Sequence, residues 1–278
     1  MLKIQKILFT TTYILYIISL WTIFATANLQ GYRHLLAEMT HENGFFETIS
    51  VVWLFSISIY GIYTLYRDKK YLNRYFTIGI TTFSIIAFLA GMEEISWGQQ
   101  IFHFQTGEYF LQHNLQHEEN LHNLIDANLF SSIIYSSVYT LLIFIPLFYK
   151  IFPTLHRFKL LRYFDINPHI ILIVIFSSIF QKYFYNSDIG VIADMTALIV
   201  ALVLFGYFIF LQKDRVWLTL HYIFVVISTA IAISSYRVFS FFNMQYEIRE
   251  SFVVLASLLI FIELIQKEKD EKGSMDNR

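Results

Sequence analysis

Hydrophobic residues in this chain are gathered into long runs, and polar residues fall mainly in the short stretches between them. A run of about 20 apolar residues can cross a bilayer as an α-helix, whose backbone polar groups bond to one another inside the helix. The pattern therefore predicts an all-α polytopic membrane bundle of about eight transmembrane helices. The predicted spans are residues 7–27, 46–66, 76–98, 129–151, 168–186, 189–211, 216–237 and 249–266.

The two ends of the chain delimit this helical domain. Lys3 and Lys6 precede the first span, and Ala25-Thr26-Ala27 at its end has the form of a signal-peptide cleavage site. The apolar core between them is longer than the roughly 7–15 residues of a signal peptide, which favours an uncleaved first span. We expect residues 1–266 to form a single transmembrane domain and the charged residues 267–278 to be a disordered cytoplasmic tail.

Lys and Arg predict the orientation, because cytoplasmic loops of membrane proteins carry an excess of positive charge. With the N-terminus inside, most of the 20 basic residues fall on the cytoplasmic side. The exceptions, on or near the outer side, are Arg33, Lys182, Arg237 and Arg249. Both termini are therefore expected in the cytoplasm, and the linker between the third and fourth spans is expected outside, as short interfacial helices.

Composition agrees with a membrane location and excludes several functions. The chain is 56% hydrophobic and 15% charged, whereas soluble domains are about 25% charged. The absence of cysteine excludes disulfides, thiolate catalysis and Cys-ligated metals, and a net charge of −1 argues against a nucleic-acid partner. The excess of Ile, Phe, Tyr and Asn favours a bacterial source, and thus a multi-pass protein of the bacterial cytoplasmic (inner) membrane, in contact with membrane lipid.

The stretch Gly91–Asp126 is the strongest candidate for a functional site. It follows an apolar run, is rich in acids and histidines, and contains no Lys or Arg. Polar groups at the mouth of a span usually face a cavity, a partner or a substrate, because exposing them to lipid is costly. If the third helix continues past the membrane edge, one helical face carries Glu93, Ser96, Gln100 and His103, while Glu94 shares another face with Trp97. This face could line a pocket, or it could be an inter-helix hydrogen-bond network.

The linker that follows offers metal-binding and catalytic candidates. His113 and His117 have the i, i+4 spacing with which one helix can present two imidazoles to a metal, so a divalent metal is one candidate cofactor. His122 and Asp126 have the same spacing, as for a carboxylate that orients a histidine. From these patterns we assign candidate catalytic roles to Glu93, Glu94, His103, His122 and Asp126. Candidate substrate-binding residues are Ser96, Trp97, Gln100, Asn114, Asp194, Arg237 and Glu250, and candidate metal ligands are His113 and His117.

The run EEISWGQ, followed by HNLQ and NLHN, resembles a stretch of about 35 residues found in multi-pass bacterial membrane proteins, and this resemblance implies no activity. The Glu93-Glu94 pair is also similar to that of CAAX-processing-type intramembrane proteases. Those proteases carry an Arg shortly after the pair and a spaced F-x-x-x-H element. In this chain Gln99 and Gln100 occupy the positions at which those proteases have the Arg, and Phe102 and His103 are adjacent rather than spaced.

Three functions fit these patterns. The first is an integral-membrane hydrolase or group transferase whose Glu/His site opens to the outer face and acts on a lipid, a lipid-linked or a membrane-embedded substrate. The second is a proton-coupled transporter, which would use intramembrane acids such as Asp194. The third is an assembly protein whose outer surface binds a membrane-protein partner.

Overall fold

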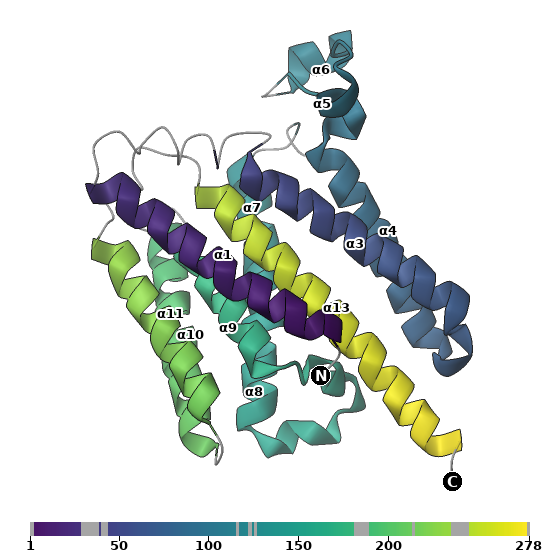
Figure 1. Cartoon of the computed structure of the whole chain (residues 1–278), viewed down its shortest axis with the longest axis vertical. Coiled ribbons are helices and arrows are strands. Elements are labelled where there is room, and N and C mark those ends of the chain that lie inside the picture. The colour runs from purple at the N-terminus through teal and green to yellow at the C-terminus, as the bar shows by residue number, and fades with distance from the viewer. Residues whose placement is uncertain are drawn as a thin grey trace. The chain divides into compact units, whose positions relative to one another are not determined.

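The structure is a computed structural model that describes residues 3–28, 39, 44–114, 117–121, 124, 127–180, 189–212, 215–234 and 245–276. All regular elements in these ranges are helical, as the hydrophobic pattern predicts (Figure 1). Within them, three segments are long and apolar enough to cross a membrane: Phe45–Arg67, Arg74–Glu94 and Ile133–Ile151. Shorter apolar helices occupy Ile7–Ser19, Pro168–Phe180, Met195–Leu211 and Val216–Ala232.

The chain divides into two compact units. The single transmembrane domain over residues 1–266 stays a prediction from the sequence. Unit 1 comprises Met1–Phe46 and Val138–Ile260, and unit 2 comprises Glu47–Ser137 and Phe261–Arg278. Each unit is described by itself.

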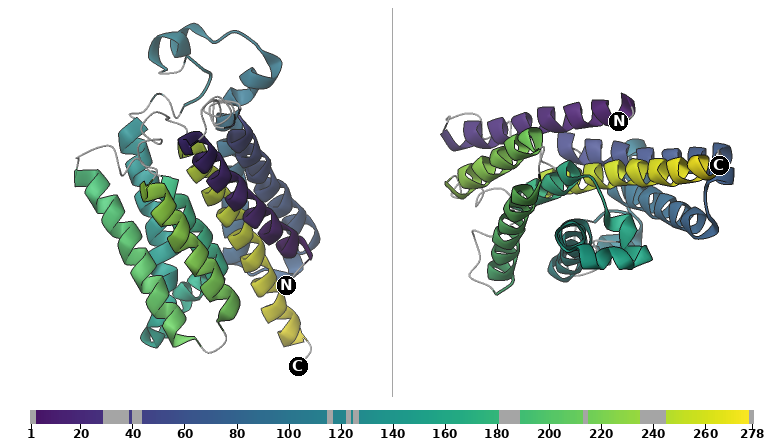
Figure 2. Two further views of the ribbon diagram at one scale, coloured as in Figure 1. Left: turned by 60° about the vertical axis from the view of Figure 1, so that its left-hand side comes forward. Right: turned by 90° about the horizontal axis from the view of Figure 1, so that it is seen from below.

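Unit 1 is built around helix α9 (Pro168–Ser177), in which every residue from Ile170 to Ser177 is buried. A helix that is apolar on all sides belongs in a protein core or in a membrane, and here neighbouring helices bury it. Its covering helices include α10 (Ile189–Leu211) and α11 (Val216–Ser234), which also contact each other (Figure 2). Rings on α1 (Lys3–Asn28) and on the first half of α13 (Gln245–Asp276) also pack on Phe176 of α9.

One long helical segment of unit 1 changes its winding partway. It begins as α7 (Ala127–Tyr139), continues as a π-helical stretch, Thr140–Phe144, and ends as α8 (Ile145–Ile151). Pro146 at the start of α8 lacks a backbone N–H, so a local change in hydrogen-bond register is expected just before it. Short 3-10 turns, η5 (Pro153–Arg157) and η6 (Lys159–Phe164), then lead to α9, and Lys150 pairs with Asp165 at 2.5 Å.

Unit 2 is based on an antiparallel pair of helices, α3 (Phe45–Arg67) and α4 (Arg74–Glu94), which lie side by side in Figures 1 and 2. The short turn η1 (Lys69–Tyr71) joins them, and Asn73 caps α4 by accepting a hydrogen bond from the N–H of Phe76 at 2.8 Å. Glycines allow close approach at two points: Gly61 faces Ser84, and Gly91 faces the ring of Phe55. Small residues at such crossings increase van der Waals contact between membrane helices.

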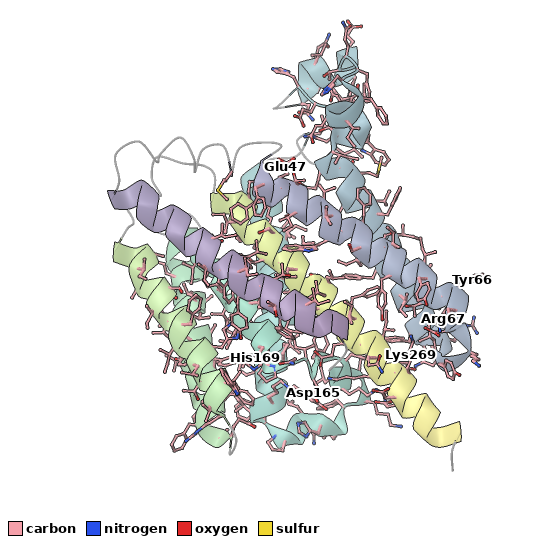
Figure 3. All side chains as sticks on the ribbon, viewed as in Figure 1. Glu47, Tyr66, Arg67, Asp165, His169 and Lys269 are labelled. Atoms are coloured by element: carbon pink, nitrogen blue, oxygen red, sulfur yellow. The ribbon has the colours of Figure 1, made fainter. Side chains whose placement is uncertain are left out.

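Helix α13 runs to Asp276, within the stretch 267–278 for which the sequence predicts a charged cytoplasmic tail. Its charged residues have partners on the connection between α3 and α4: Lys269, which is labelled in Figure 3, pairs with Asp68. The carboxylate of Glu268, which is buried, accepts hydrogen bonds from the side-chain amide of Asn73 at 2.5 Å and from its backbone N–H at 3.3 Å. These contacts tie α13 to the α3–α4 connection at Glu268 and Lys269.

Candidate functional site: a polar cap after α4

The helix that carries Glu93 ends one residue later, so the expected continuation as far as His103 is wrong. Helix α4 ends at Glu94, and the 3-10 turn η2 (Ser96–Gly98) follows, with φ of 47° at Ser96, 53° at Trp97 and 94° at Gly98. Three successive residues in the left-handed region break the helix. The four-residue helix α5 (Gln99–Phe102) then runs in a new direction, beyond the end of α4 (Figure 1). Glu93, Ser96, Gln100 and His103 therefore do not share one helical face.

Glu93 binds two parts of the chain that are far apart in sequence. Its Oε1 accepts a hydrogen bond from the indole N–H of Trp97 at 2.6 Å. Its Oε2 accepts one from the backbone N–H of Leu121, also at 2.6 Å. Charge-assisted hydrogen bonds of this length are among the stronger ones in proteins. Glu93 thus fastens the turn after α4 to the end of the linker.

Ser96 lies in a buried network with three side chains of the linker. Its hydroxyl donates to Oε2 of Glu118 at 2.5 Å. The side-chain amide of Asn120 donates to the same carboxylate oxygen at 3.0 Å and to the Ser96 hydroxyl at 3.3 Å. Asn114 donates in turn to the side-chain and backbone oxygens of Asn120, both at 2.8 Å. Ser96, Asn114 and Asn120 are all at most 2% exposed, so these three side chains are shielded from water, whereas Glu118 is partly exposed.

A second set of hydrogen bonds closes the loop around this network. The side-chain oxygen of Gln99 accepts from the N–H of Glu119 at 2.9 Å, and its amide donates to the Thr106 hydroxyl at 2.6 Å. Thr106 donates to the carbonyl of His117 at 2.7 Å. Glu119 accepts from the N–H of Gly107 at 2.5 Å. We call residues 93–121 the polar cap, in which residues 115 and 116 lie outside the described part.

The polar cap also concentrates the unusual backbone geometry of the chain. Among the described residues, the non-glycine residues with positive φ are Ser96, Trp97, His103 and His117, and all four lie in the cap. A left-handed conformation costs an L-residue about 1–2 kcal/mol. Such conformations persist where surrounding contacts enforce them, and they cluster at functional sites.

The histidines of the cap are exposed and do not form the expected helical pair. Helix α6 (Glu108–His113) ends at His113, and His117 follows in a left-handed conformation, so their i, i+4 spacing is not helical. Nδ1 of His113 lies 2.9 Å from the Tyr109 carbonyl, and Nδ1 of His117 lies 2.8 Å from the Leu111 carbonyl. A carbonyl only accepts, so each Nδ1 carries the proton, and Nε2 of a neutral ring is left as an acceptor. Across the described residues, His, Asp and Glu form no group of three placed to hold a metal ion.

The other candidate residues are distributed as follows. Trp97 and Asn114 belong to the hydrogen-bonded cap, while His103 is exposed after α5 and Gln100 lies within α5. Glu94 is the last residue of α4 and partly exposed. Glu250 belongs to unit 1, on α13, where it lies 3.7 Å from the guanidinium of Arg249. For Asp194, only its position within α10 is described, and His122, Asp126 and Arg237 lie outside the described residues.

Four central residues of the cap were not among the sequence candidates: Gln99, Glu118, Glu119 and Asn120. The signal of Glu118, Glu119 and Asn120 in the sequence is the polar run HEEN, and that of Gln99 is the pair Gln99-Gln100. Their partners lie about 20 residues away, and no local periodicity relates two segments at that separation.

Comparison with known proteins identifies no relative: neither a protein family, a curated protein nor a solved structure matches the chain.

Proposed function

We propose that the protein is an integral-membrane enzyme, a hydrolase or group transferase, whose reaction centre is the polar cap. The observation that carries this proposal is the hydrogen bond of 2.5 Å from the Ser96 hydroxyl to the Glu118 carboxylate, with Asn120 bonded to both. A hydroxyl bonded to a base that is itself held by a third group is the arrangement of an activated nucleophile.

In this mechanism Ser96 attacks an acyl or phosphoryl centre of the substrate. Its proton passes to Glu118 as the new bond to Oγ forms, and Glu118 later returns the proton to the leaving group. Asn120 keeps the carboxylate aligned with the hydroxyl through its two donated hydrogen bonds. Glu93 acts as a positioning residue, because its bonds to Trp97 and Leu121 hold the strained turn on which Ser96 lies.

Access to Ser96 requires movement of the linker, because Ser96 is fully buried. Residues 117–121 supply Glu118 and Asn120 to the network, and exposed Leu121 binds Glu93 through its N–H. Close to Ser96 in sequence, Trp97, Ile101 and Phe102 expose large apolar surfaces. Such surfaces suit the acyl chains of a lipid or lipid-linked substrate.

The test is covalent labelling of the protein in membranes with a long-chain alkyl fluorophosphonate, a probe that phosphonylates activated serines. Label is expected on Ser96 and should disappear in Ser96→Ala. The matched control is Ser137→Ala, whose exposed hydroxyl only bonds the Ile133 carbonyl of its own helix, and this variant should label fully. Absence of label on Ser96 in the wild-type protein would reject this mechanism.

Glu118→Gln separates a catalytic role from a structural one. The amide keeps the size of the carboxylate and can still accept from Ser96, but it cannot take up the proton. Loss of a general base typically lowers rates by about 10²–10⁴-fold. We expect labelling to slow on that scale while the thermal midpoint changes little. Unchanged labelling would assign Glu118 a purely structural role.

A second function, as an assembly protein, is favoured by the exposed apolar side chains of the cap. Phe102 is 78% exposed and Tyr109 is 60% exposed, on either side of the α5–α6 connection. Exposed apolar patches mark interaction sites for membranes or proteins. If a membrane-protein partner binds here, Tyr109→Ser would release it without affecting fluorophosphonate labelling of Ser96.

The proposed topology is eight spans with both termini in the cytoplasm, in a bacterial inner membrane. It is supported by the distribution of Lys and Arg and by the apolar segments of the chain. It would place the polar cap at the outer surface, within reach of lipid headgroups.

A further inference from the structure

Unit 1 contains a buried cluster of three titratable side chains that the proposed reaction does not use. Nδ1 of His169 lies 3.0 Å from Nδ1 of His221. Nε2 of His221 lies 3.2 Å from the hydroxyl of Tyr16. The cluster joins three helices: Tyr16 lies on α1, His169 on the first turn of α9 (Figure 3) and His221 on α11.

The three side chains of the cluster differ in how much of their surface is exposed to solvent. His169 is partly exposed, His221 is 3% exposed and Tyr16 is fully buried. Aromatic rings surround the two imidazoles: Phe9 contacts His169, and Tyr13 contacts His221. Phe176, Phe224 and Phe252 enclose Tyr16. Among the described residues no carboxylate or cationic side chain forms a hydrogen bond or ion pair with either imidazole.

The hydrogen bonds that link Tyr16, His221 and His169 can be oriented in two ways, which differ in which group of each pair is the donor. A neutral imidazole has one donor and one acceptor nitrogen, so one of the two facing Nδ1 atoms must carry the proton. If His221 donates to His169, its Nε2 accepts from Tyr16. If His169 donates to His221, the Nε2–H of His221 donates to the Tyr16 oxygen. One direction converts into the other when a proton moves across each bond, while one end of the chain takes up a proton and the other end releases one.

We propose that Tyr16, His221 and His169 form a proton relay between the partly exposed surface at His169 and the interior of unit 1 at Tyr16. A proton taken up at Nε2 of His169 displaces the Nδ1 proton onto His221. His221 then releases its Nε2 proton to Tyr16, and Tyr16 gives up its hydroxyl proton. One proton enters and one leaves, and no lasting charge is buried in the apolar interior, where an isolated charge is costly.

The relay has a continuation on α1. Thr12, Tyr16 and Ser19 are buried at the i, i+4, i+7 spacing of one helical face. The hydroxyl of Ser19 is buried and has no hydrogen-bond partner among the described residues. Buried polar atoms are nearly always bonded, so an open hydroxyl one turn beyond Tyr16 is a candidate for the next proton acceptor. The proton would thus move along α1, as in proton-coupled membrane proteins.

The test uses purified protein in liposomes that contain a pH-sensitive dye, with a membrane potential imposed by potassium and valinomycin. Wild-type protein should acidify the interior faster than empty liposomes. Tyr16→Phe removes only the hydroxyl, and it should lose this flux. Tyr13→Phe makes the same change one turn earlier on α1, on a ring that contacts His221, and it should retain the flux.

His221→Phe should also lose the proton flux. If His221→Phe fails to fold, Tyr16→Phe alone still tests the proposal. Flux equal to that of empty liposomes in the wild type, or equal flux in Tyr16→Phe and wild type, would overturn the proposal. A metal ion found in stoichiometric amount and lost in His221→Phe would also overturn it, because both Nδ1 lone pairs would then bind the metal. None of these outcomes depends on Ser96, so they are independent of the labelling test.

Discussion

At the scale of single residues, the carboxylates and amides of the polar cap act first as hydrogen-bond partners of the backbone. Glu93 accepts from the N–H of Leu121, and Glu119 accepts from that of Gly107. Asn114 donates to both oxygens of Asn120. A buried donor or acceptor that loses its partner costs about 1–3 kcal/mol. Each of these side chains therefore contributes to a loop that includes four left-handed residues.

Asn114→Ala should unfold the cap locally. It leaves both oxygens of Asn120 without their amide donor, at an expected cost of about 1–3 kcal/mol. Limited proteolysis should then cut near residues 114–121 much faster than in the wild type. Gln112→Ala is the control, because Gln112 is exposed and bonds Glu108 only at 3.4 Å. Equal cleavage rates in the two variants would contradict the assigned role of Asn114.

At the scale of elements, the α3–α4 pair depends on where its glycines lie. A Cβ on Gly61 would collide with the hydroxyl of Ser84 and lie 3.1 Å from both Ser84 Cβ and the Phe261 ring. A Cβ on Gly79 of α4 would meet nothing within 4 Å. The same residue type is therefore under steric constraint at one position and free of it at the other.

Gly61→Val should destabilise the protein by about 1–3 kcal/mol, as overpacking of a closely packed site usually does. Gly79→Val adds the same atoms to the same kind of helix without a collision, so it should change stability far less. Thermal unfolding in detergent, followed by circular dichroism, compares the two. Similar midpoints for both variants would show that α3 and α4 do not approach closely at Gly61.

The end of α13 gives a second prediction at this scale. Glu268→Leu removes the acceptor for the backbone and side chain of Asn73, at an expected cost of about 1–3 kcal/mol. Lys267→Met, by contrast, removes a pair with Glu263 on the same helix, worth only about 0.3–0.5 kcal/mol. A larger loss of thermal stability in Lys267→Met than in Glu268→Leu would reject this account of the C-terminal helix.

At the scale of the whole molecule, the proposed topology specifies the face of the membrane at which each connection between helices lies. The native chain has no cysteine, so single substitutions provide specific labelling sites without background. Glu108 in the cap and Lys159 in η6 are both exposed, and the proposed topology places them on opposite sides.

Glu108→Cys should react with a membrane-impermeant maleimide on intact cells, because the cap is proposed to lie outside. Lys159→Cys should react only after the cells are permeabilised, because η6 lies among the basic residues expected inside. Gel-shift labelling of both variants measures this directly. The reverse pattern would invert the topology, and labelling of both sites on intact cells would contradict the span count.

The sequence by itself determined the helical membrane class and the position of the polar stretch. Both depend on local composition: an apolar run of sufficient length must satisfy its backbone within a helix, and acids beside such a run must find partners. The importance of Glu93, Ser96, Trp97 and Asn114 could be inferred in this way. Such local patterns can identify interaction partners that lie within a few residues of each other in the sequence.

Only the tertiary structure decided which groups meet. The left-handed turn at Ser96 to Gly98 replaced a predicted helical face with a loop, because buried contacts outweigh the local cost of positive φ. It brought Glu118 and Asn120 to Ser96, and it left His113 and His117 on separate carbonyls. In unit 1, the packing of α9 against α11 brings together His169 and His221, which are 52 residues apart. Contacts at such separations depend on how helices pack, which no periodicity of the sequence records.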